Sequence, residues 1–211
     1  MKTVIFDFDG TLADTLENGI KIYNQLAKKK NLPLFTKKEK DLLRTQTIPQ
    51  LAKTFQIPLY KVPLIVKQLR SLMLKNKIIA KPFIGIKPTL WQLKKSGFKL
   101  GIISSNTEEN IDFFLEQQDL KNLFSFVSSE KNIFGKDKKI KKVIKKEKLA
   151  KKKVVYIGDE VRDIEAAHKA GISVIAVTWG FNSEKILQKY QPTKIVRDPK
   201  EIFNAVEEVF G

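Results

Sequence analysis

The sequence predicts an α/β fold, a doubly wound parallel sheet with a helical segment inserted after its first strand. Over most of the chain, short runs of β-branched and aromatic residues alternate with apolar residues at helical spacing. That alternation is typical of parallel strands joined by right-handed helical crossovers. Residues 13–80 interrupt it with helical patterns alone. A length of 211 residues suits one large domain with a modest insertion, and 42% hydrophobic residues are enough for a core.

The first strand is expected at residues 3–8, TVIFDF, because this run is β-branched and aromatic. From residue 13 to residue 30, apolar residues recur at helical spacing and lysines close the segment. Thr36 and Glu39 have the spacing of a capping box, so a second helix is expected to follow them. Further helices are expected at residues 49–55 and 62–74. The insertion is therefore predicted to be helical throughout, with no strand.

After Pro82, strands and helices alternate again to the end of the chain. Strands are expected at residues 98–103, 124–127, 154–157 and 173–177, with a last edge strand at 194–196. Helices are expected at residues 88–95, 108–117, 138–149, 164–170 and 199–209. We therefore predict two domains, an α/β core made of residues 1–13 and 81–211 and an α-helical cap made of residues 14–80.

The formal net charge is +17, which raises the question of a polyanionic partner such as nucleic acid. The excess is almost entirely lysine, whereas specific recognition of phosphates and bases relies on the planar fork of arginine. Aromatic residues are not interleaved with the basic ones as a stacking platform requires. We therefore expect solvated lysine-rich helix faces and no specific nucleic-acid partner, with weak nonspecific binding at low salt.

The chain contains no cysteine, which excludes disulfides and thiolate metal sites. Met1 and Lys2 lead directly into an apolar segment that is too short for a signal peptide. No stretch reaches the roughly 18 consecutive apolar residues expected of a membrane span. The sequence thus predicts a cytoplasmic protein with no membrane partner, and it leaves the oligomeric state open.

Polar and acidic residues stand at the carboxyl ends of three predicted strands. They are Asp7 and Asp9 at the end of the first strand, Ser104, Ser105 and Asn106 after the strand at 98–103, and Asp159 and Asp163 after the strand at 154–157. Ligands of parallel α/β sheets bind beyond these strand ends, so the side chains are expected to meet in one cleft. Turn chemistry accounts for Asp9 before Gly10, but not for Asp7 inside an apolar strand.

A cluster of carboxylates needs a cation, because ionised acids repel one another and are costly to bury alone. Oxygen ligands without histidine or cysteine suit Mg²⁺. In proteins Mg²⁺ commonly keeps several waters and binds the phosphates of a substrate. The residues themselves therefore favour a magnesium site that receives a phosphorylated compound.

These motifs resemble those of the haloacid dehalogenase-like hydrolase superfamily over essentially the whole chain. DFDGTLADT, residues 7–15, is similar to the first motif, and Ser104 after FKLGII to the second. Lys136 in FGK is similar to the third motif, and GDEVRD, residues 158–163, to the fourth. Within the superfamily the chain looks most like phosphoglycolate phosphatase-like members with an α-helical cap. The resemblance implies a Rossmann-like core and a Mg²⁺-dependent phosphatase acting on a small phosphorylated metabolite, with phosphoglycolate as one candidate.

The resemblance also implies a role for each catalytic residue. Asp7 would attack phosphorus and form an aspartyl-phosphate, and Asp9 would protonate the leaving alcohol and later take a proton from water. Ser104 would bind phosphoryl oxygens, and Lys136 would balance anionic charge and steady Asp7. Lys136 stands in a lysine-rich run, so Lys131 remains an alternative, as does Lys138.

The same resemblance implies a set of metal and substrate contacts. Mg²⁺ would sit between an Asp7 oxygen, the backbone carbonyl of Asp9 and Asp159. Asp163 would orient a metal-bound water or Lys136. Possible contacts to the substrate are Thr11, Ser105 and Asn106, the last two being equally suited to cap the following helix, and Arg44 and the lysines of the insertion.

Three other functions compete with the phosphatase. A phosphosugar mutase of the same superfamily would keep the same acids and differ mainly in its cap contacts. A haloalkanoate dehalogenase is disfavoured, because it needs no metal and lacks the acid that stands here as Asp9. A catalytically inactive binding protein with a basic docking surface would not need Asp7, Asp9 and Asp159 together, and all are present.

Overall fold

The structure is a computed structural model that describes residues 1–30, 32–75, 80–129 and 135–211. Its main sheet contains β1 (Thr3–Phe6), β4 (Lys99–Ser104), β5 (Phe124–Ser129), β6 (Val154–Gly158), β7 (Ser173–Val177) and β8 (Lys194–Val196). The described strands form a six-stranded sheet in the order β5-β4-β1-β6-β7-β8, and every pairing is parallel. The predicted fold class is therefore confirmed, and β8 lies at the edge as expected.

Strand β1 is buried along its whole length at the centre of the sheet. Its side chains alternate between two apolar clusters, with Val4 and Phe6 on one face and Ile5 on the other. The first cluster includes residues from α5 (Ile86–Lys95), α6 (Glu108–Gln117) and α10 (Ile202–Phe210), and the second includes residues from α7 (Lys136–Lys146), α8 (Val161–Ala170) and α9 (Glu184–Lys189). Helices thus cover both faces, which explains why the central strands are apolar on both sides.

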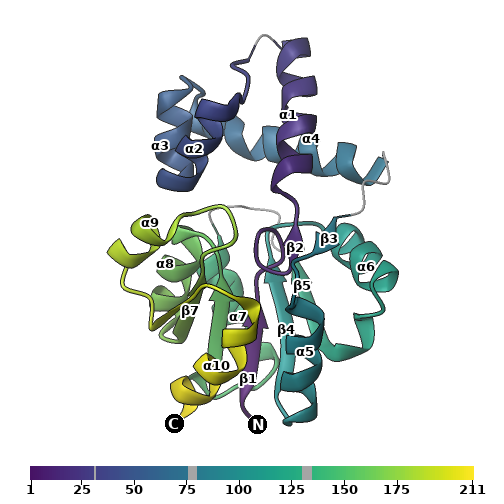
Figure 1. Ribbon diagram of the computed structural model, residues 1–211, viewed down its shortest axis with the longest axis vertical. Coiled ribbons are helices and arrows are strands. Elements are labelled where there is room, and N and C mark those ends of the chain that lie inside the picture. Colours follow the sequence, from purple (N-terminus) through teal and green to yellow (C-terminus); the bar gives the residue numbers. More distant parts are fainter. Residues whose placement is uncertain (31, 76–79, 130–134) are drawn as a thin grey trace.

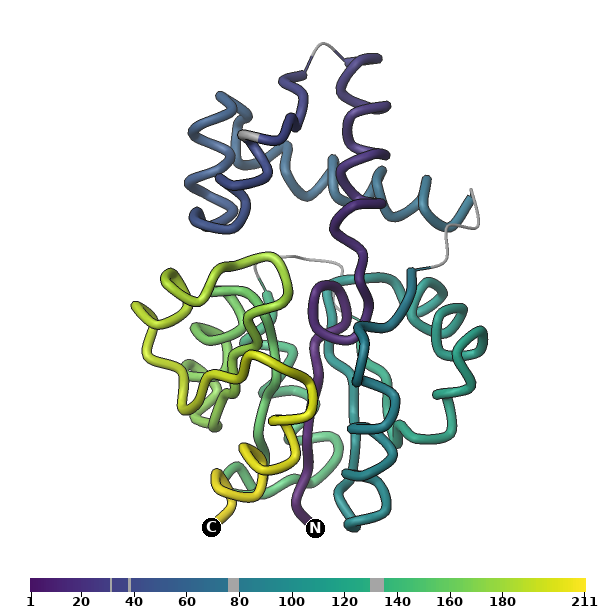
Figure 2. Tube along the Cα trace, viewed as in Figure 1, coloured from purple at the N-terminus to yellow at the C-terminus, as the bar shows by residue number. Residues whose placement is uncertain are grey.

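Helices α1 (Leu16–Lys30), α2 (Lys37–Thr45), α3 (Ile48–Thr54) and α4 (Val62–Lys75) lie together beyond one end of the sheet. Figure 1 shows this helical group above the sheet, with both chain termini at the opposite end. The chain crosses between the two parts at neighbouring places, once on leaving the sheet and once on returning (Figure 2). These helices are the expected insertion, and residues 31 and 76–79 of the insertion lie outside the described residues.

The prediction that the insertion contains no strand was wrong at its start. Ala13 and Asp14 form β2, which pairs antiparallel with β3 (Lys81–Pro82), and helix α1 begins only at Leu16. The pairing arises because the outgoing and returning segments of the insertion run side by side. A ladder of two residues on each strand is too short to leave a periodic signal in the sequence.

Other differences concern the ends of elements and one short helix. The first strand ends at Phe6 instead of residue 8, because the chain turns there and the Phe8 carbonyl accepts hydrogen bonds from the amides of Leu12 and Ala13. Helix α7 begins at Lys136 and helix α8 at Val161, each earlier than predicted. Helix α9 was not predicted, since six residues are too few for a helical period to be recognised. None of the described helices combines the length and the apolar character needed to cross a bilayer.

Candidate active site

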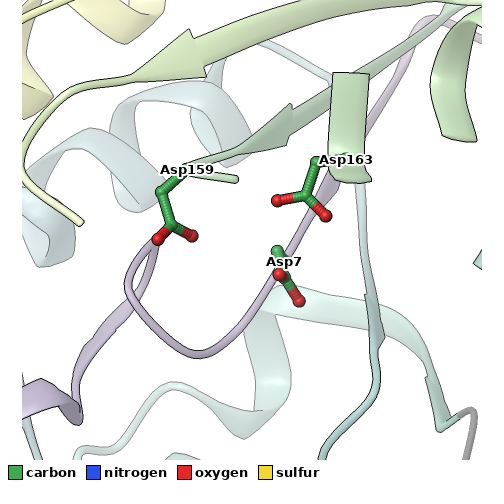
Figure 3. A group of neighbouring side chains, drawn as sticks. All are labelled: Asp7, Asp159 and Asp163. Carbon is green, nitrogen blue, oxygen red and sulfur yellow. The ribbon is translucent and has the colours of Figure 1, made fainter. Parts of the chain in front are cut away.

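The predicted acidic residues converge at the carboxyl ends of β1 and β6. Asp7 directly follows β1, Asp159 follows β6, and Asp163 lies in the first turn of α8. Each offers a carboxylate oxygen within 4.8 Å of the other two, and all of them are buried. Figure 3 shows the side chains of Asp7, Asp159 and Asp163 close together, coming from the two strand ends and the helix start. Residues far apart in the sequence therefore form one acidic centre.

Lys136, the first residue of α7, supplies the positive charge on one side of this centre. Its Nζ donates a hydrogen bond to Asp7 Oδ2 at 2.7 Å and another to Asp163. Burial lowers the pKa of Lys136, but the neighbouring charges of Asp163 and Asp7 outweigh burial and raise it, so the ammonium form is retained. Lys138 is exposed, and Lys131 lies outside the described residues.

Asp7 is held as an anion. Burial raises its pKa, yet the charges of Lys136 and Arg162 outweigh that effect, and the pKa of Asp7 lies below its usual value. The backbone amide of Phe8 also donates to Asp7 Oδ1 at 2.8 Å. Asp163 differs, because burial raises its pKa to about 6 in spite of the opposing charge of Lys136.

Asp159 has a different environment. Its carboxylate accepts hydrogen bonds from the Thr11 hydroxyl and the Phe181 amide, each at 2.7 Å. Among the described residues, no lysine, arginine or histidine nitrogen lies within 4.0 Å of this carboxylate. Burial and the nearby charges of Glu160 and Asp163 raise the pKa of Asp159 well above its usual value. A fully buried carboxylate of this kind requires either a proton or a cation.

Two glycines allow the backbone to approach Asp159 closely. A Cβ atom at Gly10 or at Gly180 would lie 2.2 Å from Asp159 Oδ2, a distance that no side chain can adopt. Gly10 also has a φ of 77°, in the left-handed region that favours glycine. The ligand atoms that Asp7, Asp159 and Asp163 bring together are carboxylate oxygens, which fit a hard divalent cation such as Mg²⁺.

The carboxyl group of Asp9 lies outside this acidic cluster and faces β4 instead. Both of its oxygens accept from the side-chain amide of Asn106, at 3.1 and 3.0 Å. Burial raises the pKa of Asp9, and the charge of Asp7 adds to this while Arg70 opposes it. Asp9 therefore holds a proton more readily than Asp7, two residues away.

The sequence left Asn106 equally compatible with helix capping and with a substrate contact, and the structure places it at the start of α6 and against Asp9. The N-cap of α6 is Thr107, whose hydroxyl accepts from the amide of Asn110 at 3.3 Å. The Asn106 side chain bridges that helix start and Asp9, because its Oδ1 also accepts from the amide of Thr107 at 2.8 Å. Ser104 is buried below it, and its hydroxyl accepts from the Asn106 amide at 3.1 Å.

The structure adds two arginines that were not among the predicted site residues. The Ser105 hydroxyl accepts from Arg70 Nη2 at 2.9 Å and from Arg162 Nη1 at 3.1 Å. Arg162 is also paired with Glu160, whereas no described carboxylate lies within 4.0 Å of the Arg70 guanidinium. A guanidinium that forms no close ion pair beside a cleft is suited to bind an anion.

Arg44, the arginine of the insertion that the sequence suggested, has another position. Its guanidinium donates to the backbone carbonyls of Gly180 at 2.9 Å and Thr178 at 3.1 Å, and so fastens the helical insertion to the loop after β7. Arg162 had a recognisable signal, because it directly precedes Asp163 in GDEVRD. Arg70 had none, since it lies in an ordinary amphipathic helix of the insertion.

A cavity of about 280 Å³ lies between the helical insertion and the strand ends. Asp9, Asn106, Arg70 and Arg162 line its polar end, and the insertion supplies mostly apolar walls. Of the predicted site acids, Asp9 lines this partly open space, which can receive a ligand beside the acidic centre.

Three comparisons with known proteins bear on this site. A model of the haloacid dehalogenase-like hydrolase family matches residues 4–177. The chain is 30% identical over 209 residues to the phosphoglycolate phosphatase of Synechococcus elongatus, covering 99% of both chains. It is 23% identical over 225 residues to a pyrophosphatase of Bacillus mycoides, covering 100% of this chain and 99% of that one. A solved haloacid dehalogenase-like hydrolase from Streptococcus pneumoniae has the same fold, with a TM-score of 0.81, 23% identity and coverage of 97% and 98%.

Proposed function

Because the chain belongs to the haloacid dehalogenase-like hydrolase family, we propose that it is a Mg²⁺-dependent phosphatase that hydrolyses a phosphate monoester through a phosphorylated Asp7. One observation supports this most strongly. Asp7 is kept anionic by Lys136, while Asp9, two residues later, has a raised pKa. A nucleophilic carboxylate and a second carboxyl group that holds a proton more readily thus stand two residues apart, as the reaction needs.

In the first step an Asp7 oxygen attacks phosphorus, and the bond between phosphorus and the ester oxygen breaks. Asp9 transfers its proton to that oxygen, so the alcohol leaves in neutral form. Asn106 holds the Asp9 carboxyl in place during this transfer through its hydrogen bonds at 3.0 and 3.1 Å. Lys136, fixed by Asp163, keeps the attacking carboxylate oriented and charged.

In the second step a water oxygen attacks the phosphorus bound to Asp7. Asp9, now ionised, takes a proton from this water. The bond between phosphorus and the Asp7 oxygen breaks, which releases inorganic phosphate and restores both carboxyl groups. The Asp9 carboxyl group donates a proton in the first step and accepts one in the second. This double role favours a pKa closer to neutrality than that of an exposed aspartate.

We assign the metal site to Asp7, the Asp9 backbone carbonyl and Asp159. When bound, Mg²⁺ would neutralise part of the charge that builds up as phosphate approaches the acids. Thr11 positions Asp159 through its hydroxyl, so its role lies in shaping this site. Ser104, Ser105, Arg70 and Arg162 form the surrounding polar surface for the phosphoryl oxygens.

Residues 14–80 serve in this proposal as the cap domain. Arg44 and Arg70 both cross from the insertion to the sheet, and each makes its hydrogen bonds only when the two parts are together. Closure over the acids would exclude water during the first step. Phosphoglycolate is one candidate substrate, because the relative from Synechococcus elongatus carries that name.

Turnover of p-nitrophenyl phosphate tests the proposal. We expect hydrolysis that depends on Mg²⁺ and stops when the ion is chelated. A phosphosugar mutase would hydrolyse this ester poorly and interconvert sugar phosphates instead. A binding protein would do neither. Mutase activity without hydrolysis, or no turnover at all, would reject the proposed phosphatase function.

Replacing Asp159 with alanine is expected to weaken Mg²⁺ dependence strongly. The Mg²⁺ concentration for half-maximal activity should rise by about 100-fold or more, because loss of a residue that only supports a metal ligand already costs up to that much. His168→Ala is the control, since His168 is exposed in α8, the helix that follows Asp159. Titrating activity with Mg²⁺ measures both, and equal effects of the two changes would contradict the assignment.

Replacing Arg70 with methionine is expected to raise KM by about tenfold to 100-fold, the equivalent of losing one charge-assisted hydrogen bond. The change removes the guanidinium that reaches Ser105 from the cap. Lys67→Met removes the same charge from an exposed position of the same helix and should leave KM unchanged. Steady-state kinetics on one ester measures both variants. Equal KM values for Arg70→Met and Lys67→Met would show that Arg70 binds no anion.

A further inference from the structure

The cavity above the acids is built mainly from apolar side chains. Its walls include Ile20, Phe35, Leu51, Phe55, Ile65 and Leu69, all of them from the helical insertion. The polar groups gather at the end where the insertion meets the strand ends. Sites of this kind, apolar with a few placed polar groups, bind the organic part of a small molecule.

Asp9 fixes which part of the substrate enters this cavity. In the proposed reaction its carboxyl group protonates the oxygen of the leaving alcohol. The carbon chain attached to that oxygen must therefore begin beside Asp9, which itself lines the cavity. The space beyond Asp9 is thus the site of the leaving group.

The size and polarity of this space do not match glycolate. The cavity measures about 280 Å³, close to the lower bound for sites that hold drug-sized ligands. The carboxylate of glycolate would remain near Arg70 and leave the apolar walls uncovered. A sugar would bring hydroxyl groups against walls that offer them few partners, which costs free energy.

Gly19 marks where this space meets helix α1. It lies inside helix α1 and lines the cavity, and its φ is not in the left-handed region. Glycine is disfavoured inside a helix, and the backbone conformation at residue 19 does not require it. A Cβ atom built there would meet no other atom within 4 Å, so the residue leaves open space.

We propose that the substrate is a phosphate monoester of an apolar alcohol, with an alkyl or aryl group that fills the cavity in the cap. This inference rests on the proposed phosphatase function and specifies its substrate class. The acids and arginines bind the phosphate of this substrate, and the apolar walls of the cap contact its hydrocarbon group.

A series of n-alkyl phosphates from ethyl to hexyl tests this, with phosphoglycolate alongside. We expect kcat/KM to rise about threefold to fourfold for each added methylene, the fold-change that corresponds to about 0.8 kcal/mol per buried methylene. Equal kcat/KM along the series, or a preference for phosphoglycolate over hexyl phosphate, would overturn the inference while leaving the phosphatase intact.

If no ester is turned over, the proposed function fails, and binding still tests the inference. Calorimetry would compare hexylphosphonate with ethylphosphonate in the presence of Mg²⁺. Tighter binding of the hexyl compound supports an apolar site, and equal affinities overturn it.

A matched pair of variants tests whether the hydrocarbon group occupies the cavity. Gly19→Leu fills the open space with a residue that favours helix, and it should lower the ratio of kcat/KM for hexyl over ethyl phosphate by about tenfold or more. Lys21→Leu introduces the same side chain at an exposed position of α1 and should keep the wild-type ratio. Circular dichroism verifies folding, and an unchanged ratio in Gly19→Leu would contradict the inference.

Discussion

Replacing Asp7 with asparagine is expected to lower kcat for phosphate ester hydrolysis by on the order of 10⁴-fold or more. The amide keeps the shape of the side chain but removes the nucleophilic oxygen. Nothing else described in the cleft replaces it, because Asp163 is bound to Lys136 and Asp159 to Thr11 and Phe181. Single-turnover and steady-state assays on the same ester measure the loss.

Asp14→Asn is the matched control for this change. Asp14 belongs to the same DFDGTLADT segment but is exposed, outside the acidic cluster. We expect it to retain nearly wild-type kcat. If Asp7→Asn kept a tenth or more of the wild-type rate, the reaction would not pass through Asp7.

Replacing Lys136 with methionine is expected to lower the free energy of unfolding by about 3–5 kcal/mol in the absence of Mg²⁺. The change leaves Asp7 and Asp163 buried without their shared cation. Removing one partner of a buried ion pair is costly because the remaining charge is neither solvated nor paired. Urea unfolding monitored by fluorescence measures the difference.

Lys138→Met separates this effect from the loss of any lysine in the same helix. Lys138 is exposed, so its replacement should change the free energy of unfolding by less than about 0.5 kcal/mol. The double variant Lys136→Met with Asp163→Asn should recover part of the lost stability, because one of the uncompensated charges is gone. Similar stabilities of the two lysine variants would show that the buried ion pairs contribute little.

The core was predictable because its physical signals are local. The strand at 173–177 and the helix at 108–117 were predicted with their observed limits, since apolar runs and helical periods were bounded by polar residues. The short pair β2–β3 and helix α9 were missed. Their existence depends on contacts with distant segments, which no local pattern reports.

The acidic centre was predictable for a related reason. Parallel strands place their carboxyl ends at one edge of the sheet, so Asp7 and Asp159 were expected in one cleft. That β1 and β6 are direct neighbours is known only from the structure. Lys136 was distinguished from neighbouring lysines by a family motif, and burial now distinguishes it physically. The side chains that join the cap to the core were not predictable, because Arg70 reaches Ser105 only through the packing of the insertion.

Trapping the covalent intermediate is the most direct test of the central claim that Asp7 carries the phosphoryl group. The enzyme would be mixed with Mg²⁺ and ester, quenched in acid and reduced with borohydride, which converts an aspartyl-phosphate to homoserine. Peptide mass spectrometry should find homoserine at position 7, and none after chelation of Mg²⁺ or in Asp7→Asn. Turnover without homoserine at position 7, or with homoserine at Asp9 or Asp163 instead, would contradict the account.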